Sequence, residues 1–377
     1  MTYQTDGSVT LLFYDINQIN FYKYTPGLLK ELREDPGVTV LLCYEEETTD
    51  EAALEFLSSF KNIQVGLFRS IKSVFKSHSV DAVIVNAQRI PDSLCVAYAK
   101  SRGIPTLMIQ HGMYNGHLKR SNELYIRKLY KTFKYIMYSL QVGRLCGRGM
   151  FATSVKFIQT FSLRKSYREL LASYQQIFAD HVHVYGRYWI NYHTDFFGYS
   201  EDRTRFTIVG YPELSRQLGE SKFTFCYIAQ SLYEDGRITL AELAKPLKIL
   251  QELNKDHSVV VKRHPRSLDE VYEGYGLTTT NEMPDADIFV GHYSSLLALP
   301  MALGRKVALI PLAGHDIPDY FQQSAYSAES ASDLLSLLSE ATRTKSIDDV
   351  FQIPIDPKDH KALVMTICKS EQGSRAA

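Results

Sequence analysis

The sequence predicts two α/β domains, each built on a parallel sheet with helices on both faces. Its 377 residues suit two domains of ordinary size. Short apolar runs alternate with helix-length segments along most of the chain, which is the pattern of a doubly wound sheet. Polar residues directly follow several of these runs, as they do where ligands bind at the carboxyl ends of parallel strands.

In the first domain, strands and helices are expected to alternate from the start. Apolar runs bounded by turn residues indicate buried strands, and longer segments between them indicate helices. The expected strands are residues 9–14, 38–43, 63–68, 81–86, 105–109 and 182–185. The expected helices are residues 25–34, 50–60, 70–78 and 93–102. Right-handed crossovers between these strands follow from the parallel pairing.

The second domain is expected to begin after a linker. Residues 200–205 are polar and charged, which places the first domain at 1–205 and the second at 206–350. Residues 351–377 form a polar C-terminal tail. The expected strands are residues 206–209, 223–229, 259–261, 288–290 and 307–310, and the expected helices are 238–253, 331–344 and one that opens at Ser294.

Composition narrows the class of protein. Lys and Arg together number 42, as do Asp and Glu, so global charge does not indicate a nucleic-acid partner. The five cysteines are scattered and form no CxxC pair, which is typical of reduced thiols in the cytoplasm. The N-terminus is polar and no apolar run reaches 18 residues, so we expect no signal peptide and no membrane-spanning helix.

Residues 117–170 form a basic helical insertion in the first domain. Twelve Lys or Arg residues fall between positions 119 and 169, against only Glu123 and Glu169. Three interpretations are open: a basic helix on the anionic cytoplasmic face of the inner membrane, a site for an anionic glycan or lipid-linked acceptor, or a solvated helix packed on the first domain. RNA binding lacks any accompanying module.

Two strand ends in the second domain predict a phosphate site. Lys262, Arg263, His264 and Pro265 follow residues 259–261, and Ser294-Ser295 follow residues 288–290. Alone, a His-Pro pair is usually a turn and a Ser-Ser pair is usually a helix cap. Occurring in order at two strand ends, they favour a shared anionic ligand bound by imidazole, cations, hydroxyls and a helix N-terminus.

His111 is a further candidate, in the first domain. It follows the strand at residues 105–109 within Gln110-His111-Gly112. The functional interpretation is a general base or an acceptor contact. The structural interpretation is a hydrogen-bonded loop histidine, and the sequence favours neither.

An ordered set of three short motifs resembles bacterial sialyltransferases of the two-Rossmann-domain type. The motifs are Glu234-Asp235-Gly236, His264-Pro265 and Ser294-Ser295, and the likeness covers about residues 206–312. The resemblance implies the GT-B arrangement, in which two Rossmann-like domains face across a cleft and the last segment crosses back to the first. It also implies that Glu282 holds the ribose of CMP, and Gln230 opens the loop expected to face the nucleotide.

His111-Gly112 adds a weaker likeness to teichoic-acid CDP-glycerol glycerophosphotransferases, which combine a His-Gly with a His-Pro and a Ser-Ser. The match is partial, because the tryptophan usual before that His-Gly is Gln110 in this chain.

These resemblances imply an inverting transferase that needs no metal or other cofactor. Its donor would be a CMP-linked sialic acid or Kdo-like sugar, and its acceptor a bacterial capsule or lipooligosaccharide. His264 would stabilise or protonate the departing phosphate, and Asp235 would be the base, with Glu234 and His111 as rivals. If the acidic motif belongs wholly to the nucleotide domain, His111 becomes the better base. The alternatives are a CDP-glycerol-type phosphotransferase and a non-catalytic nucleotide-sugar-binding protein.

Overall fold

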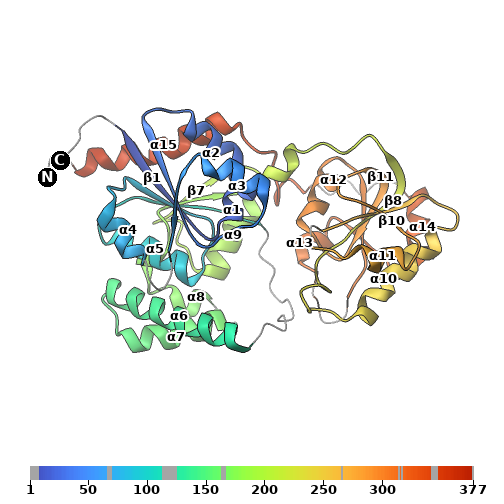
Figure 1. Cartoon of the computed structure of the whole chain (residues 1–377), viewed down its shortest axis with the longest axis horizontal. Coiled ribbons are helices and arrows are strands. Elements are labelled where there is room, and N and C mark those ends of the chain that lie inside the picture. The colour runs from blue at the N-terminus through green and yellow to red at the C-terminus, as the bar shows by residue number, and fades with distance from the viewer. Residues whose placement is uncertain are drawn as a thin grey trace. The chain divides into compact units, whose positions relative to one another are not determined.

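The computed structural model describes residues 8–65, 70–112, 125–162, 167–264, 266–312, 315, 317–340 and 347–375. The chain divides into two compact units (Figure 1). Unit 1 comprises Met1–His111, Tyr125–Gly210 and Ile355–Ala377, and unit 2 comprises Gly112–Leu124 and Tyr211–Pro354. Each unit is built around one parallel sheet, as the sequence predicts.

Unit 1 contains a seven-stranded parallel sheet in the order β3-β2-β1-β4-β5-β6-β7. The direction of winding changes between β1 and β4, which is the place where doubly wound sheets open toward ligands. The strands are β1 Val9–Asn17, β2 Val38–Glu46, β3 Lys61–Gln64, β4 Ala82–Val85, β5 Thr106–Ile109, β6 His181–Val184 and β7 Arg205–Ile208.

Helices cover the sheet of unit 1. They are α1 Ile19–Tyr24, α2 Pro26–Arg33, α3 Glu51–Ser58, α4 Ile71–Ser77, α5 Ile90–Lys100, α6 Tyr125–Leu145, α7 Met150–Ser162, α8 Tyr167–Leu171, α9 Arg187–Tyr192 and α15 Pro357–Arg375, with short helical turns η1 Gln175–Ile177 and η2 His193–Phe197. One core cluster joins the buried leucines of α2 to Val364, Ile367 and Cys368 of α15. Gly27 permits this contact, since a Cβ there would lie 3.0 Å from Pro357 Cγ. The segment expected as a polar tail is therefore a helix in the core of unit 1.

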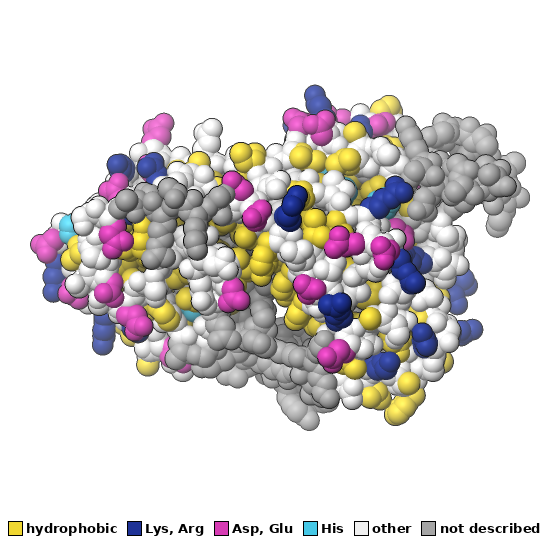
Figure 2. Space-filling model, turned by 180° about the vertical axis from the view of Figure 1, so that it is seen from behind, with side chains coloured by type: hydrophobic (Ala, Val, Ile, Leu, Met, Phe, Trp, Pro, Cys, Tyr) yellow, Lys and Arg dark blue, Asp and Glu magenta, His cyan; other side chains and the backbone are white. Residues whose placement is uncertain are grey.

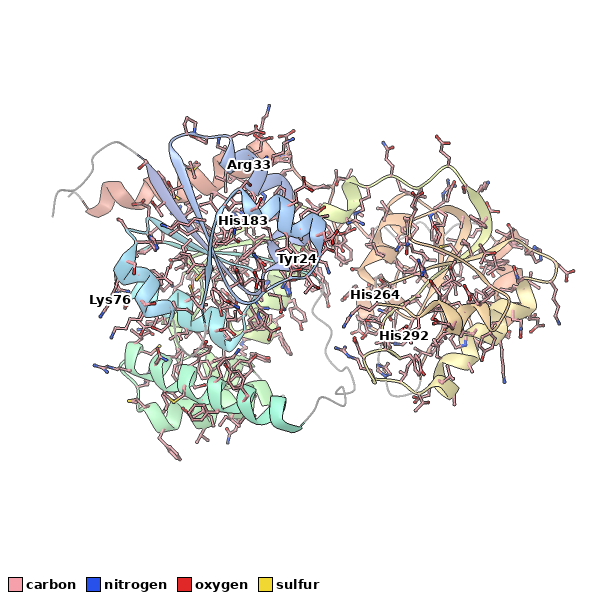
Figure 3. The ribbon with its side chains drawn as sticks, viewed as in Figure 1. Tyr24, Arg33, Lys76, His183, His264 and His292 are labelled. Atoms are coloured by element: carbon pink, nitrogen blue, oxygen red, sulfur yellow. The ribbon has the colours of Figure 1, made fainter. Side chains whose placement is uncertain are left out.

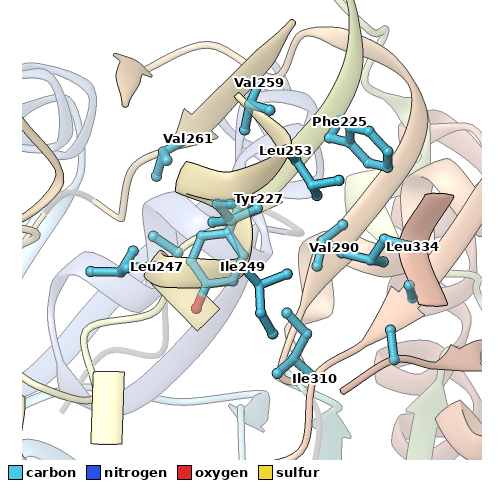
Figure 4. Packing of buried hydrophobic residues seen from close by; sticks show 14 of the residues in the cluster. Phe225, Tyr227, Leu247, Ile249, Leu253, Val259, Val261, Val290, Ile310 and Leu334 are labelled. Carbon is cyan, nitrogen blue, oxygen red and sulfur yellow. The ribbon is translucent and has the colours of Figure 1, made fainter. Parts of the chain in front are cut away.

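Unit 2 contains a six-stranded parallel sheet in the order β10-β9-β8-β11-β12-β13. Its strands are β8 Lys222–Ile228, β9 Val259–Lys262, β10 Thr278–Thr280, β11 Asp285–Gly291, β12 Lys306–Leu309 and β13 Tyr326–Ser327. Its helices are α10 Leu240–Leu253, α11 Asp269–Glu273, α12 Ala298–Ala302, α13 Asp319–Gln322 and α14 Ala331–Ser339, with turns η3 Pro212–Ser215 and η4 Ser295–Leu297. Leu247 and Leu253 of α10 pack on Phe225, Val261 and Val290 of the strands (Figure 4).

Two boundaries differ from the prediction. β7 pairs with β6 through Val182 and Phe206, so residues 206–209 belong to the first sheet and not to the second domain. The polar segment expected as a linker lies before this last strand of unit 1. The strand expected at 63–68 corresponds to β3, which ends at Gln64, and residues 66–69 lie outside the described part of the chain.

The basic insertion forms α6, α7 and α8, of which α6 packs on α5 and α7 packs on α6. Residues 117–124 lie outside the described ranges. Lys134 does not face solvent: its Nζ lies 2.5 Å from Glu45 Oε2, and the two side chains are 7% and 3% exposed. Tyr14 and Tyr138 also donate to Glu45 Oε1, each at 2.9 Å. One cation of the insertion thus fixes α6 to the end of β2.

The five cysteines are free thiols. Among the described residues, no helix combines the length and the apolar character needed to cross a membrane.

Candidate functional site

Topology brings the candidate residues of unit 2 to one edge of its sheet. β10, β9, β8 and β11 are neighbours and run parallel, so their carboxyl ends meet at the same edge. Glu282, which is exposed, follows β10, His264 follows β9, the loop containing Asp235 follows β8, and Ser294 and Ser295 follow β11. The winding direction changes between β8 and β11, which makes this edge the expected ligand-binding edge.

His264, labelled in Figure 3, accepts a hydrogen bond from the backbone. Its Nδ1 lies 3.2 Å from the backbone nitrogen of Arg266. A backbone amide only donates, so Nδ1 is the acceptor and the proton of the neutral ring is on Nε2. His264 therefore presents an N–H donor from Nε2, which suits contact with a phosphate oxygen. Pro265, the next residue of the predicted site, lies outside the described residues.

Arg266 joins the acidic loop to the His-Pro loop, and sequence reasoning missed it. Its NH1 donates to Asp235 Oδ1 at 2.6 Å, and its NH2 donates to Asp235 Oδ2 at 3.2 Å and to Ser231 Oγ at 2.9 Å. Ser231 Oγ also donates to Asp235 Oδ2 at 3.1 Å. Both carboxylate oxygens of Asp235 are thus already hydrogen-bonded within unit 2. The nearness of an arginine to His-Pro in the sequence was the available signal.

Glu234 makes a second link between the same two loops. Its Oε1 accepts from the backbone nitrogen of Leu268 at 3.2 Å, at the start of α11. Its Oε2 is buried without a hydrogen-bond partner in the described part of the chain. The acidic pair therefore holds the loop of His264 in place.

The Ser-Ser motif opens one 3-10 turn instead of a long helix. Ser294 Oγ accepts from the backbone nitrogen of Leu296 at 3.3 Å, so Ser294 is the predicted cap. The turn leads directly into the short helix α12, which contains Pro300, a residue with no amide hydrogen to bond a carbonyl of the preceding turn. The Ser295 hydroxyl has no hydrogen-bond partner among the described residues. It is the hydroxyl of the pair that remains available to a ligand.

Gln230 and His292 lie on the two sides of the winding change. The Gln230 amide donates to the carbonyl of Tyr293, which joins the loop after β8 to the loop after β11. His292 Nδ1 donates to the carbonyl of Ile310 at 3.1 Å, which leaves Nε2 as an acceptor. Burial lowers the pKa of His292 to about 4, so it is neutral at pH 7. His292, labelled in Figure 3, was not among the predicted site residues.

The two predicted cations are held differently. Lys262 Nζ donates to the carbonyl of Arg263 at 2.6 Å, and desolvation lowers its pKa. Arg263 pairs with Asp269 of α11 and donates to Asn281 Oδ1 at 2.8 Å. Arg263 is thus held by two side chains of unit 2. Lys262 is the last residue of β9 and is the cation closer to the strand end.

His111 lies in unit 1, directly after β5. Its ring is edge-on to Tyr24 at a centroid distance of 4.8 Å, and Nδ1 is buried without a hydrogen-bond partner in the described chain. Burial lowers the pKa of His111 to about 4, although Asp15 opposes this shift. The neutral ring keeps a lone pair that could accept a proton. His111 belongs to unit 1, whereas the sheet-edge residues described above belong to unit 2.

Solved structures resemble the chain over nearly its whole length. CalG4, the calicheamicin glycosyltransferase, has a TM-score of 0.55 at 11% identity over 96% of this chain and 98% of that chain. The kitacinnamycin glycosyltransferase has a TM-score of 0.51 at 10% identity over 98% of each chain. The wall teichoic acid polymerase TagF has a TM-score of 0.53 at 14% identity over 97% of this chain and 90% of that chain.

The chain has the two-domain GT-B fold. No protein-family model and no curated protein matches its sequence. Identities this low show the fold, and the chemistry has to be argued from the residues.

Proposed function

We propose that the chain is an inverting, metal-independent glycosyltransferase. It would transfer an acidic sugar, sialic acid or a Kdo-like sugar, from a CMP-sugar to a bacterial surface glycan such as capsule or lipooligosaccharide. The observation that supports this most is His264, whose Nε2–H donor stands at the ligand edge of unit 2 among the loops that carry Ser294 and Ser295. The three-motif resemblance supports CMP as the nucleotide.

The reaction needs a donor where negative charge develops. As the bond between the anomeric carbon and the phosphate oxygen breaks, the electron pair goes to that oxygen. The neutral His264 would stabilise that oxygen with a hydrogen bond donated by its Nε2–H, and Ser295 would add a hydroxyl. The acceptor oxygen would attack from the opposite face of the sugar, which inverts the anomeric centre.

The acceptor hydroxyl needs a base, and His111 supports that role better than Asp235. Asp235 belongs to unit 2, the unit of the proposed donor site, and Arg266 and Ser231 hydrogen-bond both of its oxygens. His111 is neutral and its Nδ1 is without a hydrogen-bond partner in the described chain. In this proposal Asp235 and Glu234 position the loop of His264.

A second candidate is a CDP-glycerol-type phosphotransferase. One support is the fold likeness to TagF: a TagF structure with CDPG has a TM-score of 0.51 to this chain. The other support is the His111-Gly112 motif. A third is a nucleotide-sugar-binding protein without turnover. In all three, the nucleotide would occupy the same edge of unit 2.

Nucleotide release tests the proposal. CMP release from CMP-sialic acid and CMP-Kdo, with and without oligosaccharide acceptors, should require His264, so His264→Ala should lose at least about a hundredfold in kcat. His257→Gln is the matched control, because His257 precedes β9 at the other edge of the same sheet. Release of CMP from CDP-glycerol, with glycerol phosphate transferred to the acceptor, would select the second candidate. Turnover unaffected by His264→Ala would refute the catalytic role.

The proposal also includes a lipid-linked acceptor and peripheral association with the cytoplasmic face of the inner membrane. Its support is the basic composition of the insertion.

A further inference from the structure

The outer side of α6 carries apolar side chains that no described part of the protein covers. Tyr130, Phe133 and Met137 are 48%, 56% and 40% exposed. Their spacing of three and four residues places them on one stripe of the helix. A soluble surface helix usually shows polar residues there, so this stripe needs an explanation.

The neighbouring helix repeats the feature. Phe151 of α7 is 80% exposed and Val155, four residues later, is 39% exposed. α7 packs on α6, so the two stripes belong to one helical hairpin. We call these five residues, Tyr130, Phe133, Met137, Phe151 and Val155, the α6–α7 face.

The opposite sides of both helices are firmly held. Val142 of α6 and Phe157 of α7 are fully buried, and the Lys134–Glu45 ion pair ties α6 to β2. The Phe157 ring packs edge-on against Tyr174 at a centroid distance of 5.9 Å. The hairpin therefore presents its apolar face on a fixed support, and turning that face inward would break these contacts.

The charges around this face are positive. Arg144 and Arg148 are exposed, Arg168 pairs with Asp195 at 3.3 Å, and the acidic residue within α6, α7 and α8 is Glu169. On the side of the molecule shown in Figure 2, hydrophobic and cationic side chains lie at the lower right, where α6 and α7 are found, and acidic ones are sparse there. An apolar stripe with neighbouring cations is complementary to an anionic lipid surface.

We propose that the α6–α7 face inserts into the headgroup and upper acyl region of an anionic phospholipid bilayer. A second copy of the chain fits less well, because a two-fold contact through this face would bring the same arginines together. The proposal deepens the peripheral association proposed above, and it assigns the main contribution to apolar side chains, with cations in support. Placing unit 1, which carries His111, on the membrane would bring it to a lipid-linked acceptor.

Vesicle sedimentation of the full chain tests this. The vesicles would be phosphatidylcholine alone or with 30% phosphatidylglycerol, at low and high salt. The wild type should bind the mixed vesicles. Phe133→Glu and Phe151→Glu should each lower the apparent affinity at least about tenfold, because each removes a large apolar area that would enter the bilayer and adds a negative charge that the anionic lipid repels. High salt should weaken binding without abolishing it.

Leu240→Glu and Leu335→Glu are controls, since both leucines are partly exposed on helices of unit 2, at 47% and 38%. Binding in these controls should equal that of the wild type. Three results would overturn the proposal: no vesicle binding by the wild type, unchanged binding by both phenylalanine variants, or a dimer in light scattering that those variants dissociate. No donor or acceptor is present, so the result is independent of whether the chain is a CMP-sugar transferase.

Discussion

Replacing Asp235 tests whether this residue is the general base or only part of a structural ion pair. In Asp235→Asn the side chain keeps its shape but loses the charge that pairs with Arg266. Arg266 is 61% exposed, and an ion pair of such a residue contributes about 1 kcal/mol or less. If all of that free energy appeared in the reaction barrier, kcat would fall about fivefold.

Removal of a general base costs far more, about 10²–10⁴ in rate. His111→Ala should therefore lower the kcat of transfer by more than about a hundredfold, and Asp235→Asn by less than about tenfold. The assay is steady-state transfer with saturating CMP-sugar and acceptor. Folding of each variant is checked by circular dichroism and thermal melting, because Trp189, the chain's one tryptophan, lies in unit 1 and Asp235 lies in unit 2.

Arg266→Met is the matched control, because it breaks the same ion pair and leaves the carboxylate. It should resemble Asp235→Asn. If the kcat of Asp235→Asn fell about a thousandfold while Arg266→Met retained activity, the carboxylate would act on the substrate directly, which would contradict the role of Asp235 as a structural residue.

The remaining predictions concern the stability of unit 1, which Trp189 reports because it is buried there. Lys134→Met leaves the buried Glu45 carboxylate without its cation and should lower the free energy of unfolding by about 3–5 kcal/mol in urea denaturation, whereas the additional replacement Glu45→Gln should restore most of it; equal stability of the single and double variants would contradict this. Acid should destabilise the same unit through His183 and His360, whose Nδ1 and Nε2 are 2.9 Å apart and whose pKa values burial lowers, to about 4 for His360. In the unfolded chain, histidine pKa values are near 6.5, so below that pH the unfolded state binds more protons than the native state. The free energy of unfolding should therefore fall as the pH drops from about 6.5 to 4, by up to about 1.4 kcal/mol per pH unit for each histidine. His360→Gln should flatten this dependence, and an unchanged slope would show that the pair does not control it.

Most of the fold could be predicted because the buried strands are short apolar runs with clear ends. Residues 81–86 and 259–261 predict β4 and β9 in this way, and the two parallel sheets follow from their alternation with helices. β10 and α15 are among the elements that escaped prediction, each for a physical reason. β10 consists of three threonines at a sheet edge, with no apolar run to mark it. α15 was expected as a tail because only one stripe of the helix, with Val364 and Ile367, is apolar.

Local sequence character also failed to predict the boundary between the two units. Residues 200–205 are polar, yet the strand after them completes the first sheet, because pairing partners decide membership of a sheet and local polarity does not.

At the candidate site, residue types and order were more informative than side-chain partners. The sequence placed His264 and Ser294 at strand ends, and the parallel topology brings those ends together. It did not indicate that Arg266 would engage Asp235, since that contact joins residues 31 positions apart. Nor did it mark His292, whose tautomer depends on the carbonyl of Ile310 in a neighbouring strand end.

The most direct test of the central claim is the thermal shift of the chain with CMP, CDP, UDP and GDP, repeated with His264→Ala. A nucleotide at about 100 times its dissociation constant stabilises a protein by about 2.7 kcal/mol, which a melting curve resolves. The account predicts a selective shift with CMP that decreases in His264→Ala. A selective shift with CDP would favour the phosphotransferase, and a preference for UDP or GDP, or no shift with any nucleotide, would contradict the proposed donor.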